Sequence, residues 1–414
     1  KIPVKWPCRG LGFPAPREYL WITFPGPRGP KTMDPFKEAG IMAKYTIGWM
    51  PGDGVGVDVM DATRVVLDKQ GFDAEYVHGD IGWELWKTEA NPLPDRTIEM
   101  LKNVDAALFG AITSLPKEEA EEALVPELQG TGKVYRSPIV RLRQEFNLST
   151  NLRPCKAYTG NPLNFKDGLD LVVFRQNTEG LYAGVEYHPL PQDVRDKLTQ
   201  THPAQMGKMD GVDNEDIAIS TRIFTRQGCQ NIVRDAFEYA KKFGYKTVTV
   251  VEKPNVVRET SGLMVREARK IAKDYPGIEL WETNIDAMCM WLVKNPEDYG
   301  VLVASNMFGD IVSDLCAQLV GGLGFACSGN IGEKVAVFEP SHGSAPKYVG
   351  MNKVNPIAMM LSAKMMLDHL GETDMANKLE KAVADVIAEG KYRTYDMGGT
   401  TTTTEMAEAI AAKC

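Results

Sequence analysis

The chain is poor in the residues that hold zinc or cross-link secreted proteins. Its seven cysteines and five histidines are scattered over 414 residues, and no two cysteines form a C-x-x-C pair. This distribution argues against a zinc site and a disulfide scaffold, and it favours a reducing, cytoplasmic compartment. Long apolar runs are missing too. None approaches the roughly 18–20 residues of a membrane span, so we expect no membrane partner.

An excess of positive charge is also missing. The chain carries 47 Lys and Arg against 55 Asp and Glu, which gives a net charge of −8. Because a general nucleic-acid surface is basic, we expect no nucleic-acid partner, although a local basic pocket is compatible with these numbers. The length of 414 residues exceeds the roughly 250–300 residues that one hydrophobic core usually organises, so two domains are expected.

Residues 1–43 differ from the rest of the chain. They are rich in Pro, Gly, Trp and Arg, show no helical or strand period, and contain the breaker-rich stretch Phe24-Pro-Gly-Pro-Arg-Gly-Pro30. We interpret them as an extension outside the core. The lack of a continuous apolar stretch argues against a signal peptide.

From Tyr45 onward, strand-like and helix-like segments alternate, which indicates the α/β class. The run Thr400–Thr404 is expected to lead into the last helix through a threonine cap. The predicted strands are Tyr45–Trp49, Ala106–Gly110, Leu169–Phe174, Lys246–Val251, Val301–Ala304 and Val335–Phe338. The predicted helices are Val57–Gln70, Arg96–Asn103, Thr225–Phe243, Gly262–Asp274, Asn355–Leu370 and Asn377–Glu389.

The stretch 306–314 places Asp310 and Asp314 one helical turn apart, directly after the short apolar run 300–304. The run is typical of a buried parallel strand, and we expect Gly309 to open the turn from which the two aspartates begin a helix. Since like charges at i,i+4 repel each other, a divalent cation with oxygen ligands would explain the pair. The alternative is that Asp310 caps the helix and Asp314 is solvated.

A glycine-rich turn, Pro51-Gly-Asp-Gly-Val-Gly56, follows the first predicted strand. Such a turn can offer backbone N–H groups to an anion, or it can simply be a tight bend. It is not a Rossmann fingerprint, because the last glycine of G-x-G-x-x-G would fall on Val57.

Arginines recur close to turn or strand ends in the middle of the chain, in Arg136-Ser-Pro-Ile-Val-Arg-Leu-Arg143, Asn151-Leu-Arg-Pro154 and Phe174-Arg-Gln-Asn-Thr-Glu-Gly-Leu-Tyr182. Guanidinium groups bind carboxylates in a forked geometry, so several in one cleft indicate a small polyanionic molecule. The alternative for each arginine is a solvated surface charge. Together with the aspartate pair and Tyr182 as a candidate acid, the cluster suits a metal-bound hydroxy acid.

These motifs resemble those of the β-decarboxylating dehydrogenase family, which contains isocitrate, homoisocitrate and 3-isopropylmalate dehydrogenases. The resemblance runs from about Tyr45 to the C-terminus. It implies an α/β isocitrate/isopropylmalate dehydrogenase-like fold that is not a Rossmann fold. The large cofactor-binding domain would comprise residues 44–148 and 322–414, and a small central domain, residues 149–321, would carry the dimer contact. Further matching motifs are Gly52-Asp-Gly-Val-Gly56, Leu142-Arg-Gln-Glu-Phe146, Lys253-Pro-Asn255, Asn284-Ile-Asp286 and Glu339-Pro-Ser-His-Gly-Ser-Ala-Pro346.

The resemblance also implies roles for individual residues. Arg143, Arg153 and Arg175 would bind the malate carboxylates common to these substrates, and Ser137 would lie close to the variable substituent. The expected reaction is oxidation of a hydroxy acid with hydride transfer to a nicotinamide, followed by loss of CO₂.

For metal and proton chemistry, the resemblance implies a site shared between two copies of the chain. Asp310 and Asp314 would ligate Mg²⁺ or Mn²⁺ together with Asp286 from a second copy. Tyr182 and Lys253 would form the acid–base pair, with Lys253 also reaching in from the second copy and coupled to Asp286. The active form is therefore expected to be a homodimer or a larger assembly.

The expected cofactor is NADP, with NAD possible. Lys347 and Tyr348 stand where NADP-dependent members carry a Lys-Tyr pair, and Tyr395 resembles a further contact to the 2′-phosphate. Gly399 is a departure, because bacterial NADP-dependent isocitrate enzymes have an arginine there. The expected cofactor-binding residues are Glu339, His342, Gly343, Ala345, Lys347, Tyr348, Asn355 and Tyr395.

Substrate choice is less constrained. The helix with the arginines begins Ser137-Pro-Ile139 and lacks the asparagine of the Ser-x-Asn motif common in isocitrate enzymes. A third carboxylate would have to be received by Arg136, Arg141 or Ser137, whereas Ile139 and Val140 could line an apolar pocket. We expect isocitrate first, homoisocitrate second and 3-isopropylmalate third.

A different class of function is a non-catalytic regulatory subunit of a hetero-oligomeric dehydrogenase. Such subunits lack some metal-binding or acid–base groups. This chain retains all of the groups named above, which favours a catalytic role: Tyr182, Lys253, Asp286, Asp310 and Asp314.

Overall fold

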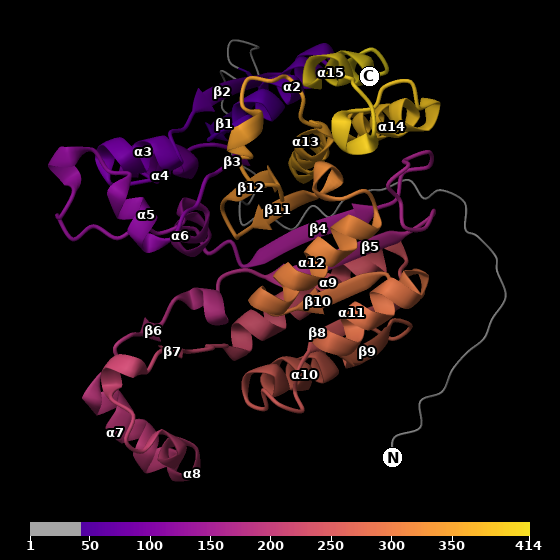
Figure 1. Ribbon diagram of the computed structural model, residues 1–414. Coiled ribbons are helices and arrows are strands. Elements are labelled where there is room, and N and C mark those ends of the chain that lie inside the picture. The colour runs from indigo at the N-terminus through magenta and orange to yellow at the C-terminus, as the bar shows by residue number, and fades with distance from the viewer. Residues whose placement is uncertain (1–42) are drawn as a thin grey trace.

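A computed structural model describes residues 43–414, so the predicted extension lies almost entirely outside the described residues. A ten-stranded mixed sheet forms the centre of the fold (Figure 1). Its strands, in spatial order, are β2 (Ala74–His78), β1 (Tyr45–Gly52), β3 (Ala106–Ala111), β12 (Ala336–Pro340), β11 (Cys327–Ile331), β4 (Thr150–Lys156), β5 (Asp170–Gln176), β10 (Val301–Ala304), β8 (Thr247–Glu252) and β9 (Glu279–Asn284).

The sheet consists of two parallel blocks joined by antiparallel strands. Pairing is parallel from β2 through β1 and β3 to β12, and again from β5 through β10 and β8 to β9. Between the blocks, β11 and β4 pair antiparallel with each other and with their outer neighbours. This arrangement is the predicted α/β fold and differs from the parallel Rossmann sheet.

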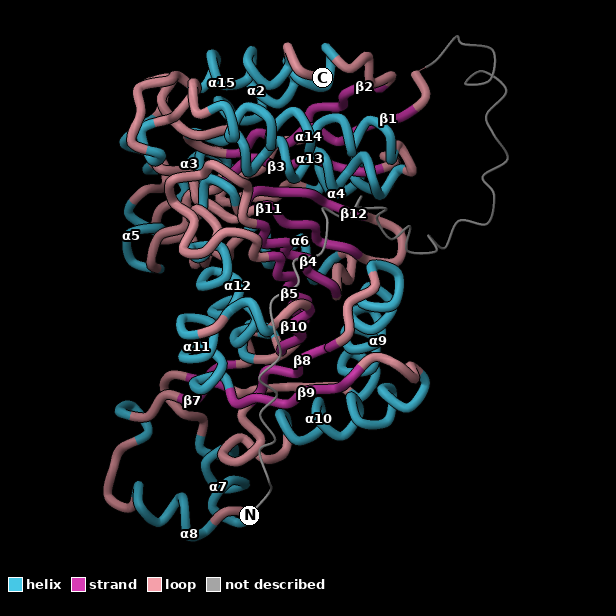
Figure 2. Tube along the Cα trace, turned by 90° about the vertical axis from the view of Figure 1, so that its right-hand side faces the viewer, coloured by secondary structure: helices cyan, strands magenta, loops and turns pink. Residues whose placement is uncertain are grey.

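Helices cover both faces of the sheet, as Figure 2 shows. Side chains of β10 alternate between the two layers, with Val301 and Val303 in one core and Leu302 and Ala304 in another. The larger core includes α2 (Val55–Lys69), α9 (Arg226–Phe243), α10 (Thr260–Ile271), α13 (Ile357–Leu370), α14 (Thr373–Glu389) and α15 (Thr403–Ala411). The opposite layer holds α4 (Asp95–Lys102) and α6 (Pro138–Glu145) over one block, and α11 (Ile285–Lys294) and α12 (Asn306–Leu319) over the other.

All six predicted strands and all six predicted helices are present, with ends shifted by a few residues at most. The predicted threonine cap is confirmed, since the Thr402 side chain and Glu405 form a reciprocal capping box at the start of α15. Within the ten-stranded sheet, the prediction missed β2, β4, β9 and β11. It also missed α3 (Trp83–Glu89), α5 (Lys117–Glu122) and α11.

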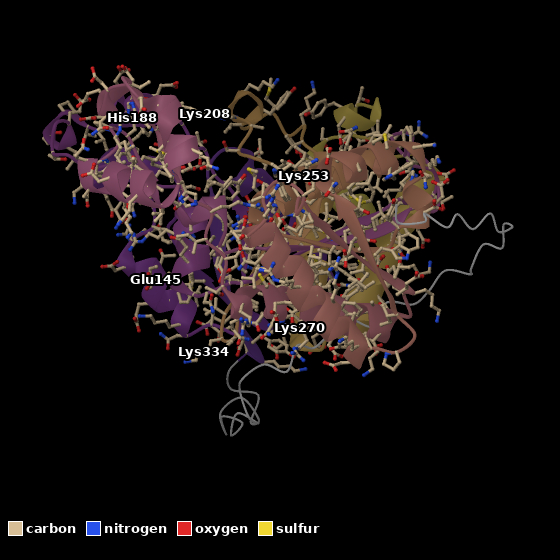
Figure 3. All side chains as sticks on the ribbon, turned by 90° about the horizontal axis from the view of Figure 1, so that it is seen from below. Glu145, His188, Lys208, Lys253, Lys270 and Lys334 are labelled. Carbon is tan, nitrogen blue, oxygen red and sulfur yellow. The ribbon has the colours of Figure 1, made fainter. Side chains whose placement is uncertain are left out.

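An arm projects from the second block and carries β6 (Glu186–Tyr187), α7 (Gln192–Thr201), α8 (Pro203–Met206) and β7 (Ile219–Ser220) (Figure 1). Its root is fixed where the Glu179 carboxylate accepts hydrogen bonds from the backbone N–H and the hydroxyl of Thr225. Viewed from below in Figure 3, His188 and Lys208 mark the arm, well apart from Lys253 in the body.

In the sheet, β2, β1, β3, β12 and β11 come from residues 44–148 and 322–414, and β4, β5, β10, β8 and β9 come from residues 149–321. The division into a large and a small domain stays a prediction. Within residues 43–414, no helix is long and apolar enough to cross a membrane.

Candidate active site

Two buried arginines and two aspartates meet in the middle of the sheet. Arg153 of β4 and Arg175 of β5 lie on adjacent antiparallel strands and are only 8% and 2% exposed. The helix α12 follows β10, packs on β5, and brings Asp310 and Asp314 to these arginines. The predicted arginine and aspartate motifs therefore form one cluster.

The start of α12 corrects one expectation. The helix begins at Asn306, with Ser305 at the N-cap position, so Asp310 lies within the helix and does not cap it. Gly309 is also inside the helix and does not open a turn. A Cβ atom on Gly309 would lie 2.7 Å from Cγ of Arg175. Glycine is required there because it lets α12 approach the arginine closely.

The acidic and basic side chains of this cluster are paired with each other. Arg175 forms an ion pair with Asp310, and Nη1 of Arg153 lies 3.2 Å from Asp314 and 3.5 Å from Asp310. The phenol of Tyr182 donates a hydrogen bond of 3.0 Å to Asp310. Carboxylates, guanidinium groups and a phenol are thus within contact distance in one chain.

Burial sets the electrostatics of this cluster. It lowers the pKa of Arg175 to about 9, with Arg153 adding to the effect, so the guanidinium remains charged at neutral pH. Burial also raises the pKa of Tyr182, and the negative charge of Asp310 raises it further. Burial likewise raises the pKa of Asp314, although Arg153 opposes the change. Tyr182 therefore stays protonated well above neutral pH.

Arg143 lies beside this cluster and is held by a network of amides. Its Nε donates to Asn330 at 2.9 Å and its Nη2 donates to Glu339 at 2.8 Å. The same Asn330 oxygen accepts from Asn151 and Asn177, both at 3.0 Å. The sequence analysis assigned Glu339 to the cofactor. It did not single out Asn330, because no recognised motif surrounds this residue in β11.

Lys253 and Asp286 form a separate pair. Lys253 Nζ lies 2.5 Å from Asp286 Oδ1, and this hydrogen bond lowers the pKa of Asp286. Across residues 43–414, no three acidic, histidine or cysteine side chains converge as a metal site would require. One copy of the chain thus brings Asp310 and Asp314 together but does not bring Asp286 to them.

The residues considered for a third substrate carboxylate or for an apolar pocket lie at the start of α6. Ser137 occupies the N-cap position and its side chain caps nothing. Ile139 is 9% exposed and packs in the core that contains α4. Arg141 donates to the Leu93 carbonyl at 2.8 Å and to Asn91 at 3.0 Å, so it is engaged by the scaffold.

A groove of about 610 Å³ lies next to the glycine-rich turn and brings together several of the predicted cofactor residues. These are His342, Gly343, Ala345, Asn355 and Tyr395. Burial lowers the pKa of His342, so the ring is neutral at pH 7, and its Nε2 has no hydrogen-bond partner within the described chain. A buried ring nitrogen without a partner fits a groove that receives a polar ligand.

Three N–H groups of the glycine-rich turn are already bonded within the chain. The N–H groups of Asp53, Val55 and Gly56 donate to the carbonyls of Ala111, Ser344 and Asp53. The turn is therefore a tight bend beside this groove, which Val55 helps to line.

Lys347, Tyr348 and Tyr395 form a cluster at the rim of this groove. The two tyrosine rings lie 5.1 Å apart, and Lys347 Nζ lies 4.9 Å from the Tyr348 ring centroid. Lys353, which no sequence motif singled out, lies over both rings.

Comparison with known proteins identifies the family. Residues 46–410 match the family described as isocitrate/isopropylmalate dehydrogenase. The chain belongs to this family. It is 41% identical to a 3-isopropylmalate dehydrogenase from Archaeoglobus fulgidus, over 88% of this chain and 97% of that protein. The crystal structure of an isocitrate dehydrogenase from Methylococcus capsulatus superposes with a TM-score of 0.77 and 36% identity, covering 89% of this chain and 99% of the other.

The chain is also 39% identical to the protein DlpA of Legionella pneumophila. The match covers 93% of this chain but only 59% of DlpA, so the chain spans about three fifths of that relative.

Proposed function

We propose that the chain catalyses the metal-dependent oxidative decarboxylation of isocitrate to 2-oxoglutarate, with NADP as hydride acceptor. The observation that carries this proposal is the convergence of Arg153, Arg175, Asp310, Asp314 and Tyr182. Buried guanidinium groups match a substrate with several carboxylates, and the aspartate pair matches a hard cation.

Substrate binding uses Arg153 and Arg175, which hold carboxylates of the substrate as ionised groups and fix their orientation. Arg153 forms an ion pair with Asp314, and Arg175 forms one with Asp310. Asp310 and Asp314 would hold the cation, and Arg153 and Arg175 would bind the carboxylates of the substrate. Arg143, oriented by Asn330 and Glu339, supplies the third guanidinium.

Asp310 and Asp314 would hold Mg²⁺ or Mn²⁺, and Asp286 from a second copy of the chain would complete the set. Their oxygen atoms fit a hard cation, and a bound cation would oppose the desolvation that raises the pKa of Asp314. When bound, the cation supplies Lewis-acid stabilisation of negative charge on the substrate.

Tyr182 and Lys253 move the protons. Lys253 would take the proton of the substrate hydroxyl after its ammonium has released a proton to its ion-pair partner Asp286. Tyr182 delivers a proton to the carbon that loses CO₂, because its raised pKa keeps the phenol protonated until the carbanion forms.

A homodimer is part of the proposal. The α11 helix exposes Met290 and Val293 by 54% and 51%, and the neighbouring α12 exposes Ile311 by 48%. Adjacent exposed apolar side chains on two packed helices suit an isologous contact with a second copy.

A complementation experiment tests the shared site. The variants Asp310→Asn and Lys253→Met should each be inactive alone, but their co-expression should restore activity, because one site of the mixed dimer combines both intact groups. Random pairing predicts about a quarter of wild-type activity. No recovery in a confirmed mixed dimer would contradict the shared site.

3-Isopropylmalate is a second candidate substrate, favoured by the engagement of Arg141 with Leu93 and Asn91. This leaves Arg136 and Ser137 as the remaining candidates to receive a third carboxylate. Homoisocitrate would need the same two residues.

Initial rates of the purified chain decide among these reactions. Isocitrate, homoisocitrate and 3-isopropylmalate are each combined with NADP or NAD in the presence of Mg²⁺. We expect the highest kcat/KM with isocitrate and NADP. If another acid is clearly preferred, that acid replaces isocitrate as the proposed substrate. A chain inactive with all six combinations, while folded and dimeric, would favour the regulatory-subunit alternative.

The cytoplasmic location stays a prediction.

A further inference from the structure

Lys353 occupies a position beside the cofactor groove that neither the family motifs nor the proposed mechanism uses. Its Nζ lies 4.9 Å from the ring centroid of Tyr395 and 5.8 Å from that of Tyr348. Lys347 lies 4.9 Å from the Tyr348 centroid. Two ammonium groups therefore share a platform of two tyrosine rings, and Tyr395 itself lines the groove.

The backbone that carries Lys353 is fixed by the start of α15. Asn352 has a φ of 51°, in the left-handed region, and its side-chain oxygen accepts from the N–H and the hydroxyl of Thr404, both at 3.0 Å. On the other side, the Val354 carbonyl accepts from the Thr403 hydroxyl at 2.6 Å. The lysine stem thus starts from an anchored segment, which reduces the entropy lost when its ammonium binds a ligand.

Neither ammonium group has a carboxylate partner within residues 43–414. Asp396, the acidic residue lining the groove, is already engaged, because its Oδ2 accepts from Asn355 at 3.0 Å and its Oδ1 accepts from Thr394 at 2.5 Å. Two uncompensated positive charges beside two phenols make a site for a compact dianion.

The backbone at Gly399 leaves no room for a side chain that could supply a further cation. A Cβ atom built on Gly399 would lie 2.1 Å from the Arg393 carbonyl oxygen and 2.5 Å from its Cβ. Since a backbone oxygen cannot move aside as a side-chain tip can, this backbone admits no arginine at position 399.

We propose that Lys353 is a specificity-determining residue that binds the 2′-phosphate of NADP jointly with Lys347, and that it supplies the charge that Gly399 cannot carry. The inference rests on the NADP preference of the proposed function. Tyr348 and Tyr395 hold the Lys353 ammonium near the groove before the cofactor arrives and donate their hydroxyls to the phosphate.

The test is calorimetric binding of 2′,5′-ADP and 5′-AMP to the full chain, since the two probes differ by the phosphate in question and need no turnover. Lys353→Met keeps the stem and removes the charge. We expect it to weaken 2′,5′-ADP binding by about tenfold or more, as for loss of a charge-assisted hydrogen bond, and to leave 5′-AMP unchanged. Lys353→Arg should retain the preference for 2′,5′-ADP.

Lys391→Met is the matched control, because Lys391 lies 4.9 Å from the Tyr392 centroid and loses the same charge outside the groove. It should bind both probes like the wild type. If the wild type prefers 2′,5′-ADP and Lys353→Met keeps that preference, the role of Lys353 is refuted while NADP use stands. If the wild type itself does not distinguish the probes, both NADP use and the role of Lys353 fail.

Discussion

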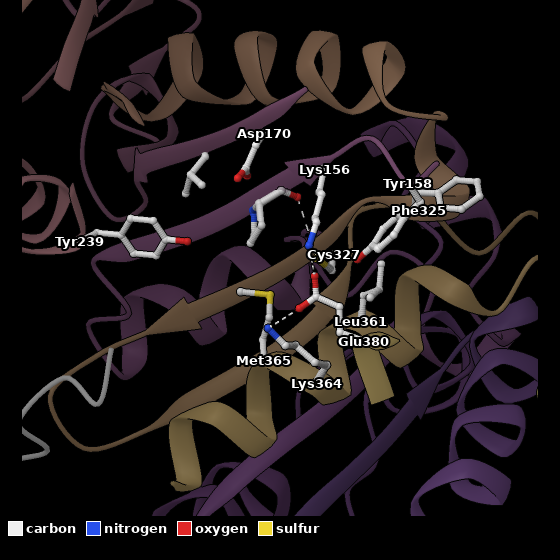
Figure 4. Close-up of a pocket in the computed structure, with 12 residues that line it drawn as sticks. Lys156, Tyr158, Asp170, Tyr239, Phe325, Cys327, Leu361, Lys364, Met365 and Glu380 are labelled. Atoms are coloured by element: carbon white, nitrogen blue, oxygen red, sulfur yellow. Dashed lines mark hydrogen bonds and ion pairs between the residues drawn. The ribbon is translucent and has the colours of Figure 1, made fainter. Parts of the chain in front are cut away.

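Replacing Glu380 by glutamine should destabilise the fold far more than the same replacement at an exposed position. Glu380 lies on α14 and faces a small cavity whose lining combines charged side chains and tyrosines with apolar residues (Figure 4). Its carboxylate lies 2.6 Å from Lys156 of β4 and 2.9 Å from Lys364 of α13. This carboxylate therefore ties the first strand of the central segment to two helices near the C-terminus.

The size of the effect follows from the pKa of Glu380. Burial alone would raise it, but Lys364 and Lys156 together outweigh burial and lower it to about 2 from an ordinary value of 4.5. This difference corresponds to about 3 kcal/mol of stabilisation at neutral pH. Breaking a buried ion pair by removing one partner costs about 3–5 kcal/mol in other proteins, which agrees.

The pH dependence has a definite sign. Because the folded-state pKa is lower than the unfolded value, the contribution of Glu380 is complete above about pH 4.5 and disappears as the pH falls toward 2. The difference between wild type and Glu380→Gln should therefore shrink across this acidic range. Asp368 lies 3.1 Å from Lys364, and burial raises its pKa to about 7, so its ionisation opposes folding as the pH rises toward neutrality.

Urea unfolding followed by circular dichroism, at one fixed protein concentration, measures the change. Glu389→Gln is the matched control, since Glu389 lies at the end of the same helix, 2.6 Å from Lys413, with half of its side chain exposed. The control should change the free energy of unfolding by less than about 0.5 kcal/mol. Equal effects of the two replacements at pH 7 would refute the argument.

Three further predictions concern the candidate active site. Asp310→Asn should fold normally and lose Mg²⁺-dependent turnover, and unchanged initial rates would contradict its role as a ligand. Tyr182→Phe should lower kcat by about 10²–10⁴ with little change in KM, the range for loss of an acid–base group; a change in KM alone would assign Tyr182 to binding. Gly309→Ala should cost about 1–3 kcal/mol in urea unfolding, because the added methyl group meets Arg175 at 2.7 Å, and a stability equal to wild type would mean that α12 relaxes freely.

Apolar periodicity was enough to predict the buried strands, and it failed where polar residues are buried. β10 reads Val-Leu-Val-Ala and was found, whereas β4 contains Asn151, Arg153 and a proline, and β11 contains Ser328 and Asn330. Those polar side chains are satisfied by one another across neighbouring strands. Such long-range compensation leaves no local pattern in the sequence.

The site was predicted as residue types and motifs, and the structure added the contacts between them. The pairing of Arg175 with Asp310 joins positions far apart in sequence, so only the register of β5 beside α12 brings them together. Lys353 carried no motif at all, and its place became visible only when the rings of Tyr348 and Tyr395 were located.

The order of strands in the sheet also constrains how the chain is made. β3 pairs with β12, which the ribosome supplies only after the whole central segment has emerged, while the neighbours of β5, β10, β8 and β9 all lie within that segment. During synthesis, the edge of β3 therefore remains unpaired until β12 has been made. An unpaired strand edge favours aggregation. Nascent chains that stall before Ala336 should be clients of chaperones that shield such edges.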